Sequence, residues 1–256
     1  MKIMILTRSM NSKLYDLSMA TVQLDYRKKK CRFTSADSYL YDRVVNSRAD
    51  IVINIDEDAF VIDNNRLKNL LTYVLDNDYV NCGVSDGGVI PIRKHNPLVT
   101  NPFFNIINVA KVREKFDLKN IKENYSEHRK EFEKFTPFDL MRGEYAYDYY
   151  EPYVAFFVWM ATNFKTLYLD ADTHKDGIST ILKDHDNQPF MLHSWYSRFY
   201  GVDEHHTQRI NNLYLEATGK KEITTKSSAL DLMIDKYGNK YFYPLKYRWE
   251  RKVLGY

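Results

Sequence analysis

Cysteine, glycine and proline are all scarce: the chain of 256 residues contains 2 Cys, 9 Gly and 7 Pro. Cys31 and Cys82 lack the close spacing of a metal site, which argues against a disulfide framework or a thiolate-bound zinc. We expect two buried free thiols in a reducing compartment. Glycine is also missing from residues 7–12, where a nucleotidyltransferase needs a Gly-rich loop to cradle phosphates.

Long apolar runs are absent as well. No run approaches the roughly 18 residues that are needed to cross a bilayer. The opening run, residues 1–6, is too short for the core of a signal peptide. We therefore expect a soluble, cytoplasmic protein, which would act on a membrane only from its surface.

Charge of one sign is not in excess either, because 37 Lys and Arg stand against 34 Asp and Glu, for a net charge of +3. So small an excess gives no case for binding a polyanion, and we expect no nucleic-acid partner. Basic and aromatic residues do alternate through 240–252. This segment suits peripheral contact with an anionic membrane surface, or else a terminal strand or helix that packs on the domain.

The order of apolar segments predicts an α/β fold. We expect strands at 2–7, 31–34, 51–55, 80–84, 89–92 and 166–169, with 80–84 and 89–92 joined as a hairpin. Helices are expected at 9–25, 38–47, 64–75 and 152–164, the last with Pro152 in its first turn. This alternation predicts a mostly parallel sheet covered by helices. Residues 217–256 are more polar and are predicted to form an appendage.

Three consecutive acids, Asp56-Glu57-Asp58, follow the continuous apolar run 51–55. Side chains at i and i+2 of an extended segment point to the same face, so Asp56 and Asp58 should lie together and Glu57 opposite. Carboxylates crowded in this way repel one another unless a cation lies between them. Hard oxygen ligands suit Mg²⁺ or Mn²⁺, especially when phosphates complete the coordination. The alternative is an acidic loop that caps the next helix.

Other polar residues follow the first two predicted strands. In an open parallel sheet, ligands bind at the carboxyl ends of the strands. Thr7 and Arg8 end the first strand, and Asp37 follows the second. Arg8 and Arg43 would neutralise a diphosphate, and Asp37 would accept a hydrogen bond from a base or ribose hydroxyl.

Segment 49–61 places Asp56 and Asp58 after the third buried strand, and it resembles the Asp-x-Asp motif of nucleotide-sugar-dependent glycosyltransferases with the GT-A fold. The resemblance covers about residues 1–200. It implies a GT-A-like, mixed, mostly parallel central sheet flanked by helices. The transferase domain would span 1–216, with a nucleotide-sugar-binding half at 1–100, an acceptor-binding half at 101–216 and the appendage at 217–256.

The resemblance also implies roles for single residues. The cofactor would be Mn²⁺ or Mg²⁺, with Asp58 as the direct ligand and Asp56 shared between the metal and the ribose. A late His in such enzymes often adds a ligand, which points to His193, and Arg198 would clamp phosphate. His193 could instead be a core histidine, and His205-His206 is an alternative pair.

An inverting transferase of this kind needs a carboxylate that deprotonates the acceptor hydroxyl. Glu151 precedes Pro152 at the start of a predicted helix, where the resemblance places that base, and Asp148 is the second candidate. Glu151 could equally be a helix-start acid that the helix dipole favours.

The expected function is therefore metal-dependent transfer of a sugar from a nucleoside-diphosphate sugar, UDP-sugar favoured, to a hydroxyl of a glycan, glycolipid or glycoprotein, with inversion. A sugar-phosphate nucleotidyltransferase, a glycan-binding module without catalysis and a carboxylate-metal hydrolase are the alternatives. The glycine-free loop at 7–12 argues against the first, and the strand–helix alternation argues against the second.

Overall fold

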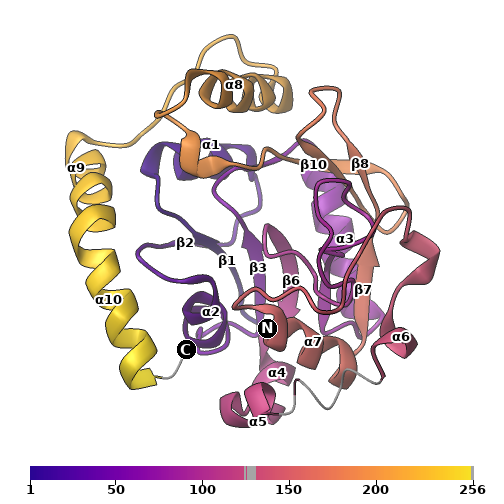
Figure 1. Ribbon diagram of the computed structural model, residues 1–256. Coiled ribbons are helices and arrows are strands. Elements are labelled where there is room, and N and C mark those ends of the chain that lie inside the picture. The colour runs from indigo at the N-terminus through magenta and orange to yellow at the C-terminus, as the bar shows by residue number, and fades with distance from the viewer. Residues whose placement is uncertain (124, 126–130, 255–256) are drawn as a thin grey trace.

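The computed structural model describes residues 1–123, 125 and 131–254. A central six-stranded sheet runs in the order β2-β1-β3-β6-β5-β7. Its strands are β1 (Ile3–Arg8), β2 (Arg27–Cys31), β3 (Ile51–Ile55), β5 (Asn81–Val84), β6 (Phe104–Asn108) and β7 (Thr166–Leu169). Among the described residues of this sheet, β6 alone runs against the others. The expected mixed α/β architecture, with a mostly parallel sheet flanked by helices, is confirmed (Figure 1).

A second, four-stranded antiparallel sheet was not anticipated. It contains β4 (Ala59–Val61), β8 (Ala171–Thr173), β9 (Thr180–Lys183) and β10 (Pro189–His193) in the order β4-β10-β9-β8. β4 begins only four residues after β3 ends, so the chain leaves one sheet for the other directly through the acidic triplet. The segment that links the two sheets is therefore held at both ends by strands.

Helices cover both faces of the central sheet (Figure 1). The longer ones are α1 (Ser12–Thr21), α3 (Asn64–Asp76), α7 (Val154–Asn163) and α8 (Glu204–Thr218). Shorter helical segments are α2 (Ala36–Ser38), η1 (Tyr39–Val44), α4 (Val109–Lys115), α5 (Leu118–Glu123), α6 (Phe132–Phe135), η3 (Phe138–Leu140) and η4 (Ser197–Phe199). The chain then forms α9 (Ala229–Tyr237), η5 (Gly238–Phe242), α10 (Tyr243–Trp249) and η6 (Glu250–Leu254).

The pattern of apolar residues explains where these helices lie. In α3, Leu67, Leu70, Leu71 and Val74 form one buried face, and Asp63 caps the helix by accepting hydrogen bonds from two backbone amides. In α7 the side chains from Val154 to Ala161 are all buried, as expected for a helix that is apolar on every side. Pro152 lies in the turn before α7 and not in its first turn, which corrects the expectation for that residue.

Two strand predictions are wrong. The second strand is Arg27–Cys31 and not 31–34. It therefore contains three consecutive lysines, a composition that is more typical of a solvated loop than of a strand. It can do so because β2 is an edge strand, on which alternate side chains remain exposed. Residues 89–92 form no strand, because both edges of β5 are already paired, with β6 and with β7. Residues 85–100 form a loop instead, closed by isolated bridges between Ser85 and Thr100 and between Gly87 and Lys94.

Cys31 and Cys82 are buried and free. Within the part of the chain that is described, no helix combines the length and the apolar character that crossing a bilayer requires. The densely charged segment 123–134 is predicted from its sequence to be an exposed helix or loop, and its residues 124 and 126–130 lie outside the described residues.

Candidate metal centre

The acidic triplet lies where β3 leaves the central sheet. All five residues of β3 are buried, and Asp56 follows at its carboxyl end, where the backbone N–H of Asp56 donates to the carbonyl of Phe103 at 2.8 Å. The hydroxyl of Ser18, from α1, donates to the carbonyls of Asp56 and Ala59. Backbone groups of the turn are thus hydrogen-bonded to Phe103 and to α1, and within the turn Asp56 Oδ1 accepts from the N–H of Glu57 at 2.9 Å.

β10 brings His193 to this turn. β4 and β10 pair antiparallel with His193 opposite Ala59, and the N–H of Ser194 donates to the carbonyl of Asp58 at 3.1 Å. The imidazole Nε2 lies 3.2 Å from Asp58 Oδ1, and the Ser194 hydroxyl donates to Asp58 Oδ2 at 2.8 Å. The ring of His193 stacks on Phe103, with centroids 4.1 Å apart. The imidazole is therefore held by rings and by a carboxylate in a single orientation.

Asp56, Asp58 and His193 each present a ligand atom, and the three atoms lie within 4.8 Å of one another. Two carboxylate oxygens and one imidazole nitrogen form a donor set that suits Mn²⁺. The Nδ1 atom of His193 is buried and has no hydrogen-bond partner among the described residues. The set fits a divalent cation in number, in chemistry and in spacing.

The electrostatics of the two aspartates point the same way. Burial and the negative charge of Asp58 raise the pKa of Asp56 to about 6, against the opposing effect of Arg8. Burial would also raise the pKa of Asp58, but the charge of His193 and the hydrogen bonds from His193 and Ser194 lower it overall. Two carboxylates that repel each other in a dry site are stabilised by a cation between them.

Glu57 is not a member of the cluster of Asp56, Asp58 and His193, in agreement with the prediction that its side chain points away from the two aspartates. Its Oε2 accepts hydrogen bonds from the Ser9 hydroxyl and from the backbone N–H groups of Met10 and Asn11. These contacts hold the loop between β1 and α1 against the acidic turn. Burial and the charge of Asp56 raise the pKa of Glu57 to about 8.

Three residues predicted to line the site, Arg8, Thr7 and Asp37, lie in different surroundings. Arg8 is near enough to lower the pKa of Asp56, and among the described residues its guanidinium makes no ion pair. Thr7 is fully buried and its hydroxyl faces Met19 Sδ at 3.9 Å, inside the core. Asp37 is buried in an ion pair with Arg251, at 2.9 Å, which the sequence did not suggest.

Arg43 is not brought to this edge of the sheet. Its guanidinium lies 3.3 Å from Asp42, and it lines a pocket of about 280 Å³ together with Met4 and Arg27. Met4 and Arg27 pair near the beginnings of β1 and β2, whereas Asp56 follows the end of β3. The π-helical η1 carries Arg43 to that opposite end.

Arg198, in η4, lies on the other side of the acidic turn. It lines a pocket of about 670 Å³, to which Glu57, Lys13 and Asn239 also contribute. Its guanidinium lies over the ring of Phe199, 5.1 Å from the centroid. An open, partly basic pocket thus adjoins the acidic turn on the side of Glu57.

The sequence did not reveal a buried polar cluster around Asp86. This side chain is fully buried, and Arg93 donates to it through Nε at 2.7 Å and Nη2 at 2.9 Å. His95, Asn101 and Tyr153 contact the same carboxylate. Burial would raise the pKa of Asp86, but the hydrogen bonds from His95 and Arg93 lower it overall. The only sequence signal was Asp-Gly-Gly at 86–88, which indicates a turn.

The same cluster connects the two halves of the predicted site. The Arg93 guanidinium lies over the ring of Trp195, 5.5 Å from the centroid, and Trp195 meets the ring of His193 at 4.3 Å. Burial would lower the pKa of Arg93, but the hydrogen bond and charge of Asp86, with smaller effects of Tyr153 and Glu151, raise it overall. Glu151 is half-buried before α7, and Asp148 is exposed. Glu151 is thus near enough to influence the charge of Arg93, whereas Asp148 is exposed to solvent.

Two further groups within the described residues have metal-like composition: Asp203 with His205 and His206, and Asp184 with His185 and Asp186. Asp203 is already the N-cap of α8, and Asp184 is bonded to Arg66 at 2.9 Å. The first group is largely exposed. Neither pairs a buried carboxylate with a buried imidazole, as Asp58 and His193 do.

No protein-family model and no curated protein matches this chain. Solved structures that match include A197 from STIV, with 13% identity and a TM-score of 0.38 over 75% of this chain and 93% of that one. An active-site mutant of LgtC has 12% identity and a TM-score of 0.47 over 92% and 100%. The mannosyltransferase PcManGT from Pyrobaculum calidifontis, in complex with GDP-Man and Mn²⁺, has 9% identity and a TM-score of 0.33 over 57% and 55%. These values assign neither a family nor a site to this chain, so the site rests on its own geometry.

Proposed function

We propose that this protein is a GT-A-like glycosyltransferase, which uses Mn²⁺ or Mg²⁺ and moves a sugar from a nucleoside-diphosphate sugar, UDP-sugar favoured, to a hydroxyl of a glycan, glycolipid or glycoprotein. The observation that carries this proposal is the cluster of Asp56, Asp58 and His193, whose ligand atoms lie within 4.8 Å of one another. The cluster lies at the carboxyl end of β3, the edge of a parallel sheet where ligands bind.

A metal bound there would neutralise charge on the diphosphate and so stabilise the departing nucleoside diphosphate. Asp58 is the more deeply buried of the two aspartates, and it remains ionised because His193 and Ser194 hydrogen bond to it. It is therefore suited to be the permanent ligand. Asp56 is partly exposed and has a raised pKa, so it is the carboxylate that a ribose hydroxyl and the metal would share.

Arg8 and Arg198 would bind the phosphates from either side of the acidic turn. Arg8 is close to Asp56, and Arg198 faces the pocket that reaches Glu57. The two arginines carry charge without a partner carboxylate among the described residues, which leaves them available to an anionic ligand. Asp37 and Arg43 are assigned no such role, because each is paired with a neighbouring charge.

Glu151 is the proposed base, and its role rests on position. It precedes α7, is half-buried and lies near Arg93, which itself contacts the ring beside His193. A carboxylate outside the metal group, at the start of α7, would be free to accept a proton from an acceptor hydroxyl. Asp148 remains the second candidate. Inversion at the transferred sugar is the stereochemical outcome that goes with a single base.

A thermal-shift panel tests the proposal directly. Nucleoside diphosphates are added to the full chain with Mn²⁺, with Mg²⁺ and with EDTA, because a ligand that binds the native state raises the melting temperature. We expect one base, uracil first, to stabilise the protein only when a divalent cation is present. Stabilisation that is equal in EDTA, or no stabilisation by any nucleotide, would contradict the proposal.

The same panel separates the alternatives. A nucleotidyltransferase would bind a nucleoside triphosphate with a sugar phosphate and release pyrophosphate. A glycan-binding module would respond to glycans and to no nucleotide. A transferase would instead hydrolyse or transfer the sugar of the matching nucleotide sugar, with release of the nucleoside diphosphate.

A further inference from the structure

The last helical segment of the chain is one long helix with an unusual orientation. The elements α9, η5, α10 and η6 follow one another without a gap from Ala229 to Leu254. Figure 1 shows this segment, in yellow, lying along the β2 side of the molecule. A helix on the surface of a protein normally turns its apolar face inward and its polar face to water. Here the two faces are exchanged.

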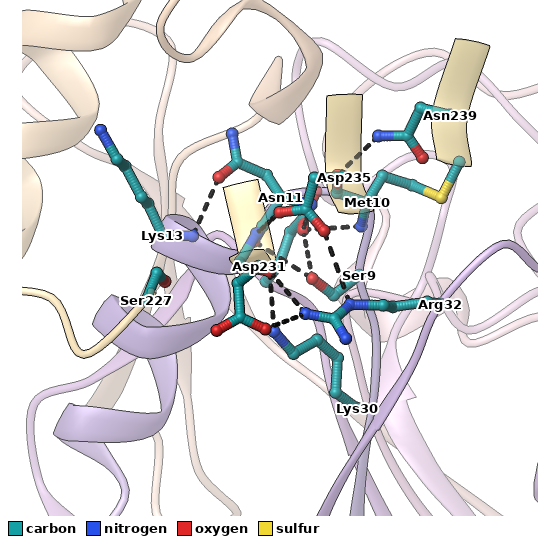
Figure 2. A network of polar contacts seen from close by, with 12 residues as sticks. Ser9, Met10, Asn11, Lys13, Lys30, Arg32, Ser227, Asp231, Asp235 and Asn239 are labelled. Carbon is teal, nitrogen blue, oxygen red and sulfur yellow. Dashed lines mark hydrogen bonds and ion pairs between the residues drawn. The ribbon is translucent and has the colours of Figure 1, made fainter. Parts of the chain in front are cut away.

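The inner face of the helix is polar. Arg32 pairs with Asp231 at 2.7 Å, and Asp235 accepts a hydrogen bond from the N–H of Ser12 at 2.6 Å. Asn239 donates to the carbonyl of Met10 at 2.7 Å (Figure 2). Hydrogen bonds and ion pairs therefore attach the first half of the helix to the domain, together with the close approach of Gly238 to the Phe33 ring.

The second half is attached in the same way. The Ser38 hydroxyl donates to Glu250 at 2.9 Å, Lys246 donates to the carbonyl of Phe33 at 2.8 Å, and Arg251 pairs with Asp37. The three acidic residues of the helix, Asp231, Asp235 and Glu250, all make these inward contacts. One ring contact, between Phe33 and Phe242 at 5.6 Å, is part of this interface.

The outer face is apolar. Every fourth residue from 233 to 253 is a large apolar or aromatic side chain that is at least half exposed: Met233 50%, Tyr237 51%, Tyr241 54%, Leu245 65%, Trp249 54% and Val253 58%. In a pure α-helix a four-residue repeat drifts around the axis. The wider π turns of η5 and η6, which close i→i+5 hydrogen bonds, lengthen the mean repeat toward four residues, which reduces this drift and agrees with the similar exposure of all six residues. We call this line the apolar stripe.

Basic residues run beside the apolar stripe at the same four-residue spacing, except at Pro244. Lys236, Lys240, Arg248 and Lys252 are all exposed, and no acid occurs between 236 and 249. Lys236 and Lys240 lie over the rings of Tyr237 and Tyr241, 5.7 and 5.1 Å from the centroids. The outward half of the helix therefore combines large apolar side chains with positive charge alone.

We propose that this helix is an interfacial helix, which docks the protein on the surface of an anionic phospholipid bilayer. Trp, Tyr and Leu on one face with Lys and Arg beside them are the composition of helices that lie in the plane of a membrane interface. The lysine stems extend along the apolar stripe while their ammonium groups reach the lipid phosphates. The Tyr, Trp and Met side chains of the stripe would also suit a protein partner, but the three lysines beside them would not, because Lys is depleted at protein–protein interfaces.

Vesicle binding by the full chain tests this proposal. The chain is mixed with phosphatidylcholine vesicles that do or do not contain phosphatidylglycerol, and the bound fraction is measured by flotation. We expect binding to the anionic vesicles only, and weaker binding at high salt, because salt screens exposed charges. The double variant Lys240→Glu/Lys252→Glu should bind the anionic vesicles on the order of tenfold more weakly or worse.

Matched controls come from other surfaces. Trp249→Ser should reduce binding, whereas Phe138→Ser, at an equally exposed aromatic residue, should not. Lys68→Glu, exposed on α3, is the charge control. Trp249 is also the most exposed tryptophan, so its fluorescence should be quenched by brominated acyl chains and the quenching should be lost in Trp249→Phe.

Several results would overturn the proposal. These are equal binding to neutral and anionic vesicles, equal loss in the test and control variants, or no quenching by brominated lipid in the unaltered chain. A dimer in sedimentation that Trp249→Ser dissociates would assign the apolar stripe to a second copy instead. The proposal does not depend on the metal centre, so vesicle binding should persist in EDTA.

Discussion

Asp58 Oδ1 and His193 Nε2 lie 3.2 Å apart although 135 residues separate them in the chain. The pairing of β4 with β10 makes this contact, because it sets His193 opposite Ala59, the residue after Asp58. The contact brings a carboxylate and an imidazole together beside a second carboxylate, that of Asp56, whose ligand atom lies within 4.8 Å of both. The candidate metal centre thus exists only because a strand of the second sheet returns to the end of β3.

Asp58→Asn should abolish metal-dependent nucleotide binding while leaving the fold intact. The amide keeps the shape of the side chain but removes the charge that attracts a cation, and we expect the affinity for Mn²⁺ to fall more than about 100-fold. Titration calorimetry of Mn²⁺ with UDP measures this. Asp186→Asn, in the other Asp–His group, is the matched control. Equal affinities in the two variants would remove Asp58 from the site.

Arg93→Met should destabilise the protein strongly. The substitution leaves the carboxylate of Asp86, which is fully buried, without its bidentate partner. Loss of one member of a buried ion pair costs about 3–5 kcal/mol in the free energy of unfolding. Adding Asp86→Asn removes the isolated charge and should recover part of the loss. Urea denaturation measures both, and a double variant no more stable than Arg93→Met would contradict this explanation.

Asp176 should make the stability fall in acid. Burial would raise its pKa, but hydrogen bonds from the Ser179 hydroxyl and the amides of Ile178 and Ser179 lower it to about 2, from the ordinary 3.8. The native state therefore holds this proton less tightly than the unfolded chain does. The contribution is present above about pH 4 and is lost as the pH falls toward 2.

Because the carboxylate of Asp176 is partly exposed, solvent screening reduces this contribution to about 1 kcal/mol. Thermal melts between about pH 4 and pH 2 measure the loss of stability with falling pH. In Asp176→Asn that loss should be smaller than in the unaltered protein by about 1 kcal/mol. Asp139→Asn, at an exposed acid on η3, is the control and should keep the unaltered slope. Parallel slopes in all three proteins would show that the hydrogen bonds to Asp176 do not act in this way.

Gly238→Ala should loosen the last helix. A Cβ at this position would lie 2.2 Å from Cζ of the Phe33 ring, so either the ring or the helix must move. Overpacking of this kind costs about 1–3 kcal/mol. Hydrogen exchange of the amides in 229–254 should accelerate. Gly143→Ala is the control, since a Cβ there meets nothing closer than 3.7 Å. If the exchange rates in Gly238→Ala are unchanged, the close approach of Gly238 to the Phe33 ring does not hold the last helix in place.

Local sequence patterns predicted well the structures that depend only on residues close to one another in the chain. The strand 51–55 and the helix 64–75 are confirmed, because a continuous β-branched run and a 3.6-residue apolar repeat each define one structure. Asp56 and Asp58 do lie close together, but in a turn, in which the N–H of Ala59 donates to the carbonyl of Asp56, and not in the extended segment that the i, i+2 argument assumed. These are local consequences of backbone geometry, so they need no knowledge of the rest of the chain.

Strand pairing could not be predicted in the same way. The strand at Arg27–Cys31 contains three lysines, and only its position at the edge of the sheet makes that composition acceptable. The segment 89–92 has the composition of a strand, but β5 has no free edge to offer it. Whether a segment pairs depends on which edges other segments have already filled, and no local window contains that information.

The sequence by itself determined the acids at the end of β3, the helices and strands with strong periodicity, and the basic and aromatic character of 240–252. Tertiary structure alone decided that His193 meets Asp58, that Asp37 is neutralised by Arg251, and that Asp86 is the centre of a buried cluster. It also decided that the last helix turns its polar face inward. The physical reason is the same in each case: a charge or an apolar side chain acquires its role from the partner that the fold places against it, and those partners are distant in sequence.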